Sequence, residues 1–272
     1  MTGIVIDIDP TIVHLGPIEL RWYGVFFALA IAAGVWLASR ELRRKGFDEA
    51  HLLPLAIWAV GGGLIGARLF HVIDRFETYT ADPLRLLAFS QGGLAVYGGL
   101  IGGSLTALAY AWRHGLSPWR LGDAAAPGMI LGQAIGRVAC IPNGDALGSQ
   151  TNLPWAFIYK NPNSMVPRDL LGVPTQPYVA YEILFDLVLL AALWRLRSVF
   201  RSDGLLFATY AAVYAAGRFL LTYARTERVW VWGLQEAQVV SALVLILALA
   251  VLAWRAASQA GRQSPAISTV PS

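Results

Sequence analysis

Three arginines lie inside long apolar stretches of the sequence, where a charged side chain is costly. They are Arg68, Arg137 and Arg218. An arginine at the middle of a membrane span costs at least about 2.5–3.5 kcal/mol, so such side chains face a protein interior and need anionic partners. A guanidinium group offers paired donors that match phosphate oxygens. We therefore expect a site for an anionic lipid headgroup. Helix packing or snorkelling to an interface is the alternative for each arginine taken singly.

Few acidic residues accompany these arginines. Asp123 and Glu182 lie near the ends of predicted spans, and we expect them to pair with one or two of the arginines. The remaining excess of positive charge predicts a cavity whose pairing a phosphate completes.

The composition is typical of a membrane protein. Of 272 residues, 56% are hydrophobic and 14% are charged, whereas soluble proteins average roughly 45–50% and 25%. Apolar stretches near the spanning length of about 20 residues recur along the chain, which favours a single membrane domain over residues 1–272. We expect an all-α polytopic protein of about seven helices, over residues 19–39, 52–73, 92–112, 121–141, 178–196, 204–224 and 235–254.

Basic residues flank these predicted helices and indicate their orientation. The segments after the first, third, fifth and seventh spans hold eleven Lys and Arg, and the opposite side holds seven. The positive-inside rule then places the N-terminus outside and the C-terminus in the cytoplasm. The net charge of +4 has this topological use, which argues against a nucleic-acid partner.

The longest connection, about residues 142–177, is rich in Asn, Pro and Gly. We expect it to form a small extracytoplasmic cap, because long loops in compact domains are often functional. Its apolar run Trp155–Tyr159 predicts a strand or an interfacial segment. The small, polar tail from about residue 256 to 272 predicts disorder.

Glycines crowd the second and third predicted spans. One interpretation is close helix packing, which small residues permit in membranes. The other interpretation concerns Gly92-Gly93 and Gly98-Gly99, which flank Tyr97. These pairs suggest a broken or re-entrant segment whose backbone N–H groups meet an anion.

The segment Gly136–Gly148 reads GRVACIPNGDALG. It resembles the signature of the prolipoprotein diacylglyceryl transferases, roughly G-R-x-G-N-F-x-N-G-E-x-x-G. Further segments resemble family motifs in the same order, and the resemblance covers about residues 9–255. They are LRWYG at 20–24, GGLAVYGGLIG at 92–102, DAAAP at 123–127, PYVAYE at 177–182, and YAAGR at 214–218 followed by Arg225.

The resemblance implies an activity. Family members sit in the bacterial cytoplasmic (inner) membrane and move diacylglyceryl from phosphatidylglycerol to the lipobox cysteine thiol of a prolipoprotein. A thioether forms and glycerol 1-phosphate leaves, without a metal or an organic cofactor. The implied partners are phosphatidylglycerol, the prolipoprotein signal-peptide and lipobox region, and membrane lipid. We expect a monomer. A transporter using the same arginine cavity is the alternative, although the sequence shows no repeated halves.

The resemblance also implies roles for individual residues. Arg137 and Arg218 bind the phosphate and stabilise the charge on the departing group, with Tyr97 and Asp145 completing the catalytic set. Asp145 stands where the family has Glu and orients an arginine. Arg68 lies in none of these motifs, and we expect it to be a structural or accessory charge. The substrate-binding set comprises Tyr23, Gly98, Gly99, Asn143, Gly148, Glu182, Tyr214 and Arg225.

Three positions depart from the family pattern: Tyr97 replaces its histidine, Cys140 an asparagine and Thr222 a late glutamate. Tyrosine, with a reference pKa near about 10, is a poor base at neutral pH. Either the base is dispensable, because a thiol of pKa about 8.5 ionises readily beside arginines, or the acceptor differs, or the protein only binds lipid. His71 is a candidate substitute base.

Cys140 is the only cysteine, which excludes an internal disulfide framework. We interpret it as a small packing residue. The alternative is a covalent relay in which its thiol takes the diacylglyceryl group first, but the stable thioether formed is a poor intermediate.

Overall fold

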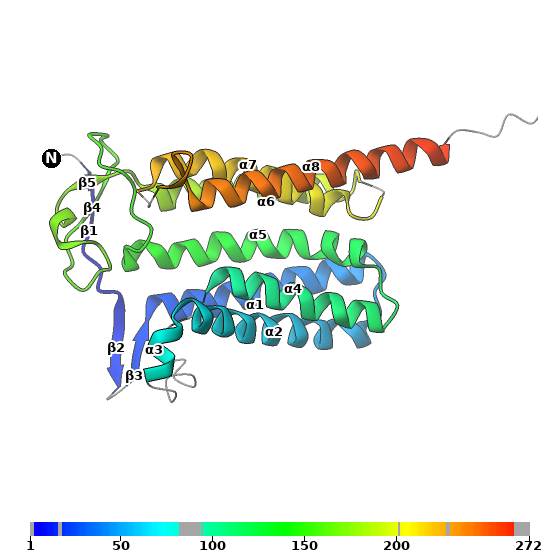
Figure 1. The fold of residues 1–272 in the computed structure, drawn as a ribbon, viewed down its shortest axis with the longest axis horizontal. Coiled ribbons are helices and arrows are strands. Elements are labelled where there is room, and N and C mark those ends of the chain that lie inside the picture. Colours follow the sequence, from blue (N-terminus) through cyan, green and yellow to red (C-terminus); the bar gives the residue numbers. More distant parts are fainter. Residues whose placement is uncertain are drawn as a thin grey trace, which may run out of the picture.

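The computed structural model is a bundle of long helices with a small sheet-containing cap at one end (Figure 1). It describes residues 3–15, 18–81, 93, 95–200, 202–226 and 229–263. Within these residues lie seven long helices, which confirms the predicted architecture. They are α1 (Trp22–Arg44), α2 (Leu52–Asp74), α4 (Val96–Arg113), α5 (Pro118–Asn143), α6 (Tyr178–Leu196), α7 (Leu205–Leu221) and α8 (Glu236–Gln263), with a short α3 (Phe76–Ala81) after α2.

Five helical segments are long and apolar enough to cross a membrane, counting only the described part of the chain. They are Trp22–Arg44, Glu49–Asp74, Pro118–Asn143, Leu205–Ala224 and Glu236–Arg255. Two predicted boundaries are wrong. The basic run after the first span belongs to the last turns of α1, and α8 continues to Gln263 through the start of the predicted disordered tail. The rest of that tail lies outside the described residues.

The helices form two groups with α5 between them (Figure 1). Helices α6, α7 and α8 lie on one side of α5, and α1, α2 and α4 lie on the other. Helix α1 packs along α5, where a Cβ added at Gly128 would stand 2.4 Å from the Gly34 carbonyl oxygen. Small residues therefore permit this close backbone approach.

Helix α5 has clear signals at both ends. Ser117 caps its first turn, accepting from the Arg120 N–H at 3.4 Å, and Pro118 occupies the first helical position. Gly144 ends the helix with φ of 72°, a left-handed conformation that glycine adopts without strain. The turn at Gly144 starts the connection to the cap.

The cap contains a three-stranded sheet of order β1-β4-β5. Strand β4 (Phe157–Tyr159) lies parallel to β1 (Ile4–Ile6) and antiparallel to β5 (Pro174–Thr175). The strand predicted in the apolar run 155–159 is therefore confirmed. Ile6, Phe157, Tyr159 and Val166 form a separate small core there, and burial raises the pKa of Tyr159.

Two hairpins complete the sheet-forming segments of the described residues. The first joins β2 (Thr11–Leu15) to β3 (Ile18–Arg21), and the second joins β6 (Val229–Val231) to β7 (Leu234–Gln235). Asp9 precedes the first hairpin and ties it to the cap, because it accepts from the Thr11 N–H and from the Asn163 amide, both at 2.8 Å. These hydrogen bonds lower the pKa of the Asp9 carboxyl.

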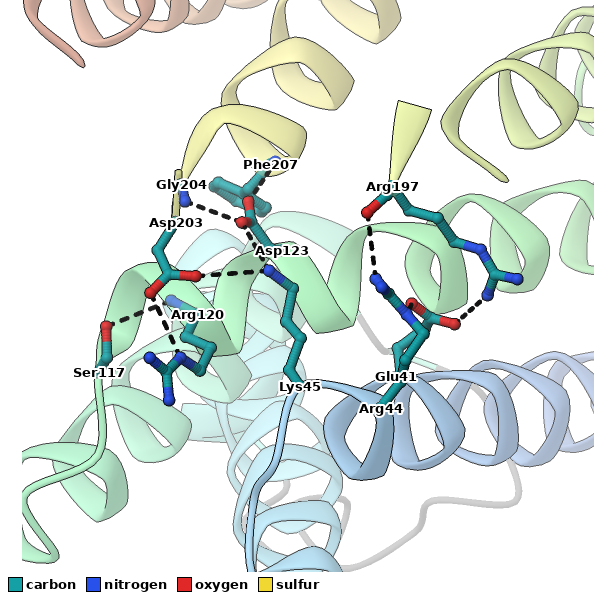
Figure 2. Close-up of polar contacts among 10 residues, drawn as sticks. All are labelled: Glu41, Arg44, Lys45, Ser117, Arg120, Asp123, Arg197, Asp203, Gly204 and Phe207. Atoms are coloured by element: carbon teal, nitrogen blue, oxygen red, sulfur yellow. Dashed lines mark hydrogen bonds and ion pairs between the residues drawn. The ribbon is translucent and has the colours of Figure 1, made fainter. Parts of the chain in front are cut away.

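At the opposite end of the bundle, Asp123 caps α7. Its carboxylate accepts from the backbone N–H groups of Gly204 and Phe207, both at 2.9 Å, and pairs with Lys45 at 3.0 Å (Figure 2). The predicted pairing of Asp123 with an intramembrane arginine is wrong, because its side chain lies at the helix ends. It satisfies the exposed donors of the first turn of α7 instead.

Glu41 is a second buried carboxylate at this end. It is fully buried and binds Arg44 at 2.7 Å and Arg197 just beyond α6 (Figure 2). Glu41 thus joins the end of α1 to Arg197 just beyond α6, and Asp123 joins the start of α5 to the start of α7. This cluster fixes two helices whose opposite halves carry Glu182 and Arg218.

Candidate active site

Arg137, Glu182 and Arg218 meet inside the bundle, one from each of α5, α6 and α7. The Arg137 Nε lies 2.9 Å from the Glu182 Oε2 as an ion pair, and the Arg218 Nη1 donates to the Glu182 Oε1. Glu182 is only 3% exposed. The predicted pairing of Glu182 with intramembrane arginines is confirmed, and one carboxylate bridges two guanidinium groups.

Tyr178 contacts Arg218 and Arg225 on the side of the site that faces the cap. It lies one turn before Glu182 on α6, is fully buried, and accepts a hydrogen bond from Arg218 through its hydroxyl. Its ring centroid is 5.8 Å from the Arg218 Cζ and 5.4 Å from the Arg225 Cζ. Cation–π contacts at this distance add to the electrostatic attraction. Arg225 therefore belongs to the same neighbourhood as the two intramembrane arginines.

The end of α5 and the loop that follows lie against this group. Arg225 pairs with Gly148 in an isolated β-bridge, and Ser149 donates to the Ala224 carbonyl at 2.9 Å. A Cβ at Gly148 would stand 2.2 Å from the Gln176 carbonyl oxygen. No larger residue fits at Gly148 without displacing backbone.

Three polar side chains lie at this end of α5. The Cys140 thiol donates to the Asp145 carboxylate at 3.6 Å, and both Cys140 and Asn143 are buried. The backbone carbonyl of Asn143 accepts from the Met165 N–H at 2.8 Å, which joins the loop to the cap. Among the described residues Asp145 forms no ion pair, so no direct contact supports its predicted role of orienting an arginine. Its direct partner is the thiol.

Two tyrosines predicted to position the headgroup border the arginines. Tyr214 lies one turn before Arg218 on α7, stacks on Tyr210 at 5.9 Å, and lies within electrostatic range of Arg137, Arg218 and Glu182. Tyr23, on α1, is 41% exposed and lies within electrostatic range of Arg137, Cys140 and Asp145. The predicted residues of α1, α5, α6 and α7 thus converge on one region.

A buried carboxylate that the sequence analysis missed lies within this region. Asp186 is 2% exposed and experiences the charges of Glu182, Arg137 and Arg218. It lies four residues after Glu182, and residues with this spacing share a helix face. That spacing was the available signal. Glu182 and Asp186 are thus two buried carboxyl groups on one face of α6.

The residues predicted on the second and third spans lie elsewhere. Gly62, Gly63 and Gly66 of α2 pack against Gly98, Gly99, Gly102 and Gly103 of α4, and we call this contact the glycine seam. A Cβ at Gly98 would stand 2.3 Å from the Gly66 carbonyl oxygen, so the helix backbones touch. The re-entrant interpretation of Gly98-Gly99 is wrong, since both belong to a regular helix; Gly92 lies outside the described residues.

Arg68 and Tyr97 lie on the same helix pair as the glycine seam. Arg68 is buried, donates to the Gly93 carbonyl at 3.0 Å, and lies 5.3 Å from the ring centroid of Tyr79. Tyr97 is 39% exposed in the first turn of α4. Arg68 thus contacts the chain segment that leads into α4, whereas Arg137 and Arg218 share Glu182.

The departure at Thr222 has a direct structural consequence. The Thr222 hydroxyl is buried and donates to the Arg218 carbonyl at 2.6 Å, at the end of α7. The described part of the chain contains no group of three or more His, Cys, Asp or Glu side chains suited to a metal ion. The side chains gathered at the site carry guanidinium, carboxylate, phenol and thiol groups.

Sequence comparisons identify relatives of this chain. The profile of the prolipoprotein diacylglyceryl transferase family matches residues 10–254. The chain belongs to this family.

Individual relatives match over nearly their full length. A phosphatidylglycerol–prolipoprotein diacylglyceryl transferase of Nostoc sp. is 39% identical over 254 residues, which cover 90% of this chain and 88% of that protein. The protein of the same name from Bacillus cereus is 35% identical over 265 residues, covering 97% and 98%. That from Bacillus mycoides is 35% identical over 250 residues. The chain is a multi-pass membrane transferase of this family.

Proposed function

We propose that this chain transfers diacylglyceryl from phosphatidylglycerol to the lipobox cysteine of a prolipoprotein at the site formed by Arg137, Glu182 and Arg218. The observation that supports this is a pair of buried guanidinium groups bridged by a single carboxylate. These three side chains together carry one excess positive charge, which matches the single negative charge of a phosphodiester. Family membership over nearly the whole chain supports the same reaction.

In the proposed reaction, the acceptor sulfur attacks the carbon of the diacylglyceryl group that bears the phosphoester oxygen. A carbon–sulfur bond forms, the carbon–oxygen bond breaks, and its electron pair leaves on the phosphate. The departing glycerol phosphate gains a negative charge, and the thiol proton passes to water. Arg137 and Arg218 stabilise the charge that develops on the phosphate oxygens. Glu182 holds both guanidinium groups in place before the lipid binds.

The other predicted residues have supporting roles in this proposal. Tyr23 and Tyr214 position the headgroup beside the arginines, and Asn143 and Gly148 shape the loop between α5 and the cap. Asp145 accepts from the Cys140 thiol, and neither residue forms a covalent intermediate. Tyr97 contributes from the first turn of α4, where its phenol hydrogen-bonds an ester or phosphate oxygen, whereas Gly98 and Gly99 serve the packing of α4 against α2.

The membrane arrangement follows from the same proposal. Residues 1–272 form one membrane domain in the bacterial cytoplasmic membrane, with the N-terminus and the cap outside and the C-terminus inside. The cap then faces the compartment in which a secreted prolipoprotein arrives. The protein acts as a monomer, since one chain supplies every residue of the proposed site.

A reconstituted assay tests the function. Purified protein is mixed with phosphatidylglycerol and a peptide containing a lipobox, and the products are measured by mass spectrometry. We expect lipidated peptide and glycerol phosphate in equal amounts. Lipid binding with neither product would overturn the proposal, and an adduct on Cys140 that forms and decays during turnover would restore the covalent relay.

A further inference from the structure

Two amide side chains at the start of α8 each have one buried hydrogen-bonding atom without a partner among the described residues. The atoms are Oε1 of Gln235 and Nε2 of Gln238. Gln238 is only 2% exposed, and Gln235 is half-buried. Because an unpaired buried polar atom is unfavourable, two of them on adjacent side chains indicate a position for a hydrogen-bonding ligand.

The other polar atom of each amide side chain already forms a hydrogen bond, which fixes the orientation of both amide groups. The backbone N–H of Gln235 donates to the Gln238 Oε1 at 3.0 Å, and the Gln235 Nε2 donates to the Arg225 carbonyl at 3.1 Å. An amide oxygen only accepts and an amide nitrogen only donates. The free atoms are therefore one acceptor and one donor. A hydroxyl group both accepts and donates, so it has the chemistry to pair with either atom.

This pair of glutamines neighbours the proposed phosphate site. Arg225, whose carbonyl holds Gln235, faces the ring of Tyr178 at 5.4 Å, and Tyr178 accepts a hydrogen bond from Arg218. The same segment pairs with Gly148. The glutamines and the arginines therefore belong to one connected group of side chains at the cap end of the bundle.

We propose that Gln235 and Gln238 bind a hydroxyl of the glycerol that leaves with the phosphate. This inference rests on the proposed function and adds a source of headgroup selectivity to it. A headgroup without a hydroxyl leaves both amide atoms unpaired, and an ammonium headgroup offers no acceptor to Gln238. Sites built to hydrogen-bond a hydroxyl discriminate strongly against analogues that lack it.

The test compares phosphatidylglycerol with phosphatidylpropanol, which has the same charge and the same number of headgroup carbons but no hydroxyl. We expect the wild type to prefer phosphatidylglycerol about tenfold or more in kcat/KM. Gln238→Met should reduce turnover of phosphatidylglycerol about tenfold while changing turnover of phosphatidylpropanol less than about twofold. Ser241→Ala is the matched control: Ser241 is also buried on α8, 6% exposed, and this variant should keep the wild-type preference.

Gln238 also caps α8 through Oε1, so Gln235→Met serves as a second variant that retains the bond from its own backbone N–H. Its lipid preference should fall in the same way. The ratio of the two lipids is measured in one preparation, so loss of folded protein does not change it. Equal turnover of both lipids by the wild type, or an unchanged ratio in both Met variants, would overturn the glutamine role alone. If the wild type transfers from neither lipid, the proposed function fails and this inference fails with it.

Discussion

Two regions hold helices together in a lipid environment by different interactions. They are the arginine site, formed by Arg137, Glu182 and Arg218, and the glycine seam. In the arginine site, side chains from three helices meet through charge, with Glu182 bridging Arg137 and Arg218. In the glycine seam, α2 and α4 meet through their backbones, because Gly66 and Gly98 have no side chains to separate them. At the level of sequence, the arginines predicted anion binding, whereas the glycines allowed either close helix packing or anion binding. The structure shows bridged charges in the first and close packing in the second.

Breaking the bridge in the arginine site should have the largest effect on stability. Glu182→Ala leaves two buried guanidinium groups without their shared carboxylate, and removal of one partner from a buried ion pair costs about 3–5 kcal/mol. We expect that loss in the unfolding free energy measured in detergent micelles. A loss below about 1 kcal/mol would mean that the carboxylate does not hold the arginines.

Adding side-chain volume to the glycine seam should have the next largest effect. A Cβ at Gly66 would stand 2.4 Å from the Gly98 carbonyl oxygen, so Gly66→Val forces α2 and α4 apart and should cost about 1–3 kcal/mol. Gly61→Ala is the matched control, because nothing lies within 4 Å of its added Cβ. If both variants unfold at the same temperature, the helices are not in backbone contact.

Removing the α7 cap at the far end should cost less. Asp123→Asn weakens the bonds to the Gly204 and Phe207 N–H groups and the pairing with Lys45, and we expect a loss of about 1–2 kcal/mol in unfolding free energy. Asp48→Asn, which alters an exposed cap accepting from Ala50, is the control and should change stability by less than about 0.5 kcal/mol. Equal losses would show that the far-end cluster does not support α7.

Histidine 71 should matter least. His71, on α2, lies edge-on to the ring of Tyr79. It belongs to the helix pair of the glycine seam and not to the helices that carry Arg137 and Arg218. His71→Gln should therefore leave transfer activity within about twofold, with an unchanged pH profile, since it removes no proposed catalytic contact. Loss of the ionisation that governs the rate near neutral pH would identify His71 as the base that replaces the family's histidine.

Much of this fold could be predicted because membrane helices have a direct signature in apolar length. The seven long helices and the strand at 157–159 fall where the sequence places them. The sheet of the cap could not be predicted, since β1 pairs with β4 across about 150 intervening residues. Helix ends were also displaced, because basic side chains continue a helix as readily as they end it.

The candidate site was predictable where motif and charge agreed, as for Arg137, Glu182 and Arg218. It was not predictable where three-dimensional position decides the partner. Asp123 binds Lys45 and the start of α7 instead of an arginine. Asp186 could be found only by following the face of α6 from Glu182 to the next residue of the same face, four positions later. Glycine pairs have the same composition in a broken helix and in a packed one, so their interpretation needed the neighbouring helix.

The central claim is that Arg137 and Arg218 carry the reaction and that Arg68 does not. The most direct measurement is glycerol phosphate release from phosphatidylglycerol in the presence of a lipobox peptide, normalised to folded protein. We expect Arg137→Ala and Arg218→Ala each to lower release about a thousandfold, the scale of losing a group that stabilises developing charge. Arg68→Ala should stay within about tenfold of the wild type. Sustained release by either variant at Arg137 or Arg218, with loss in the Arg68 variant, would contradict the account.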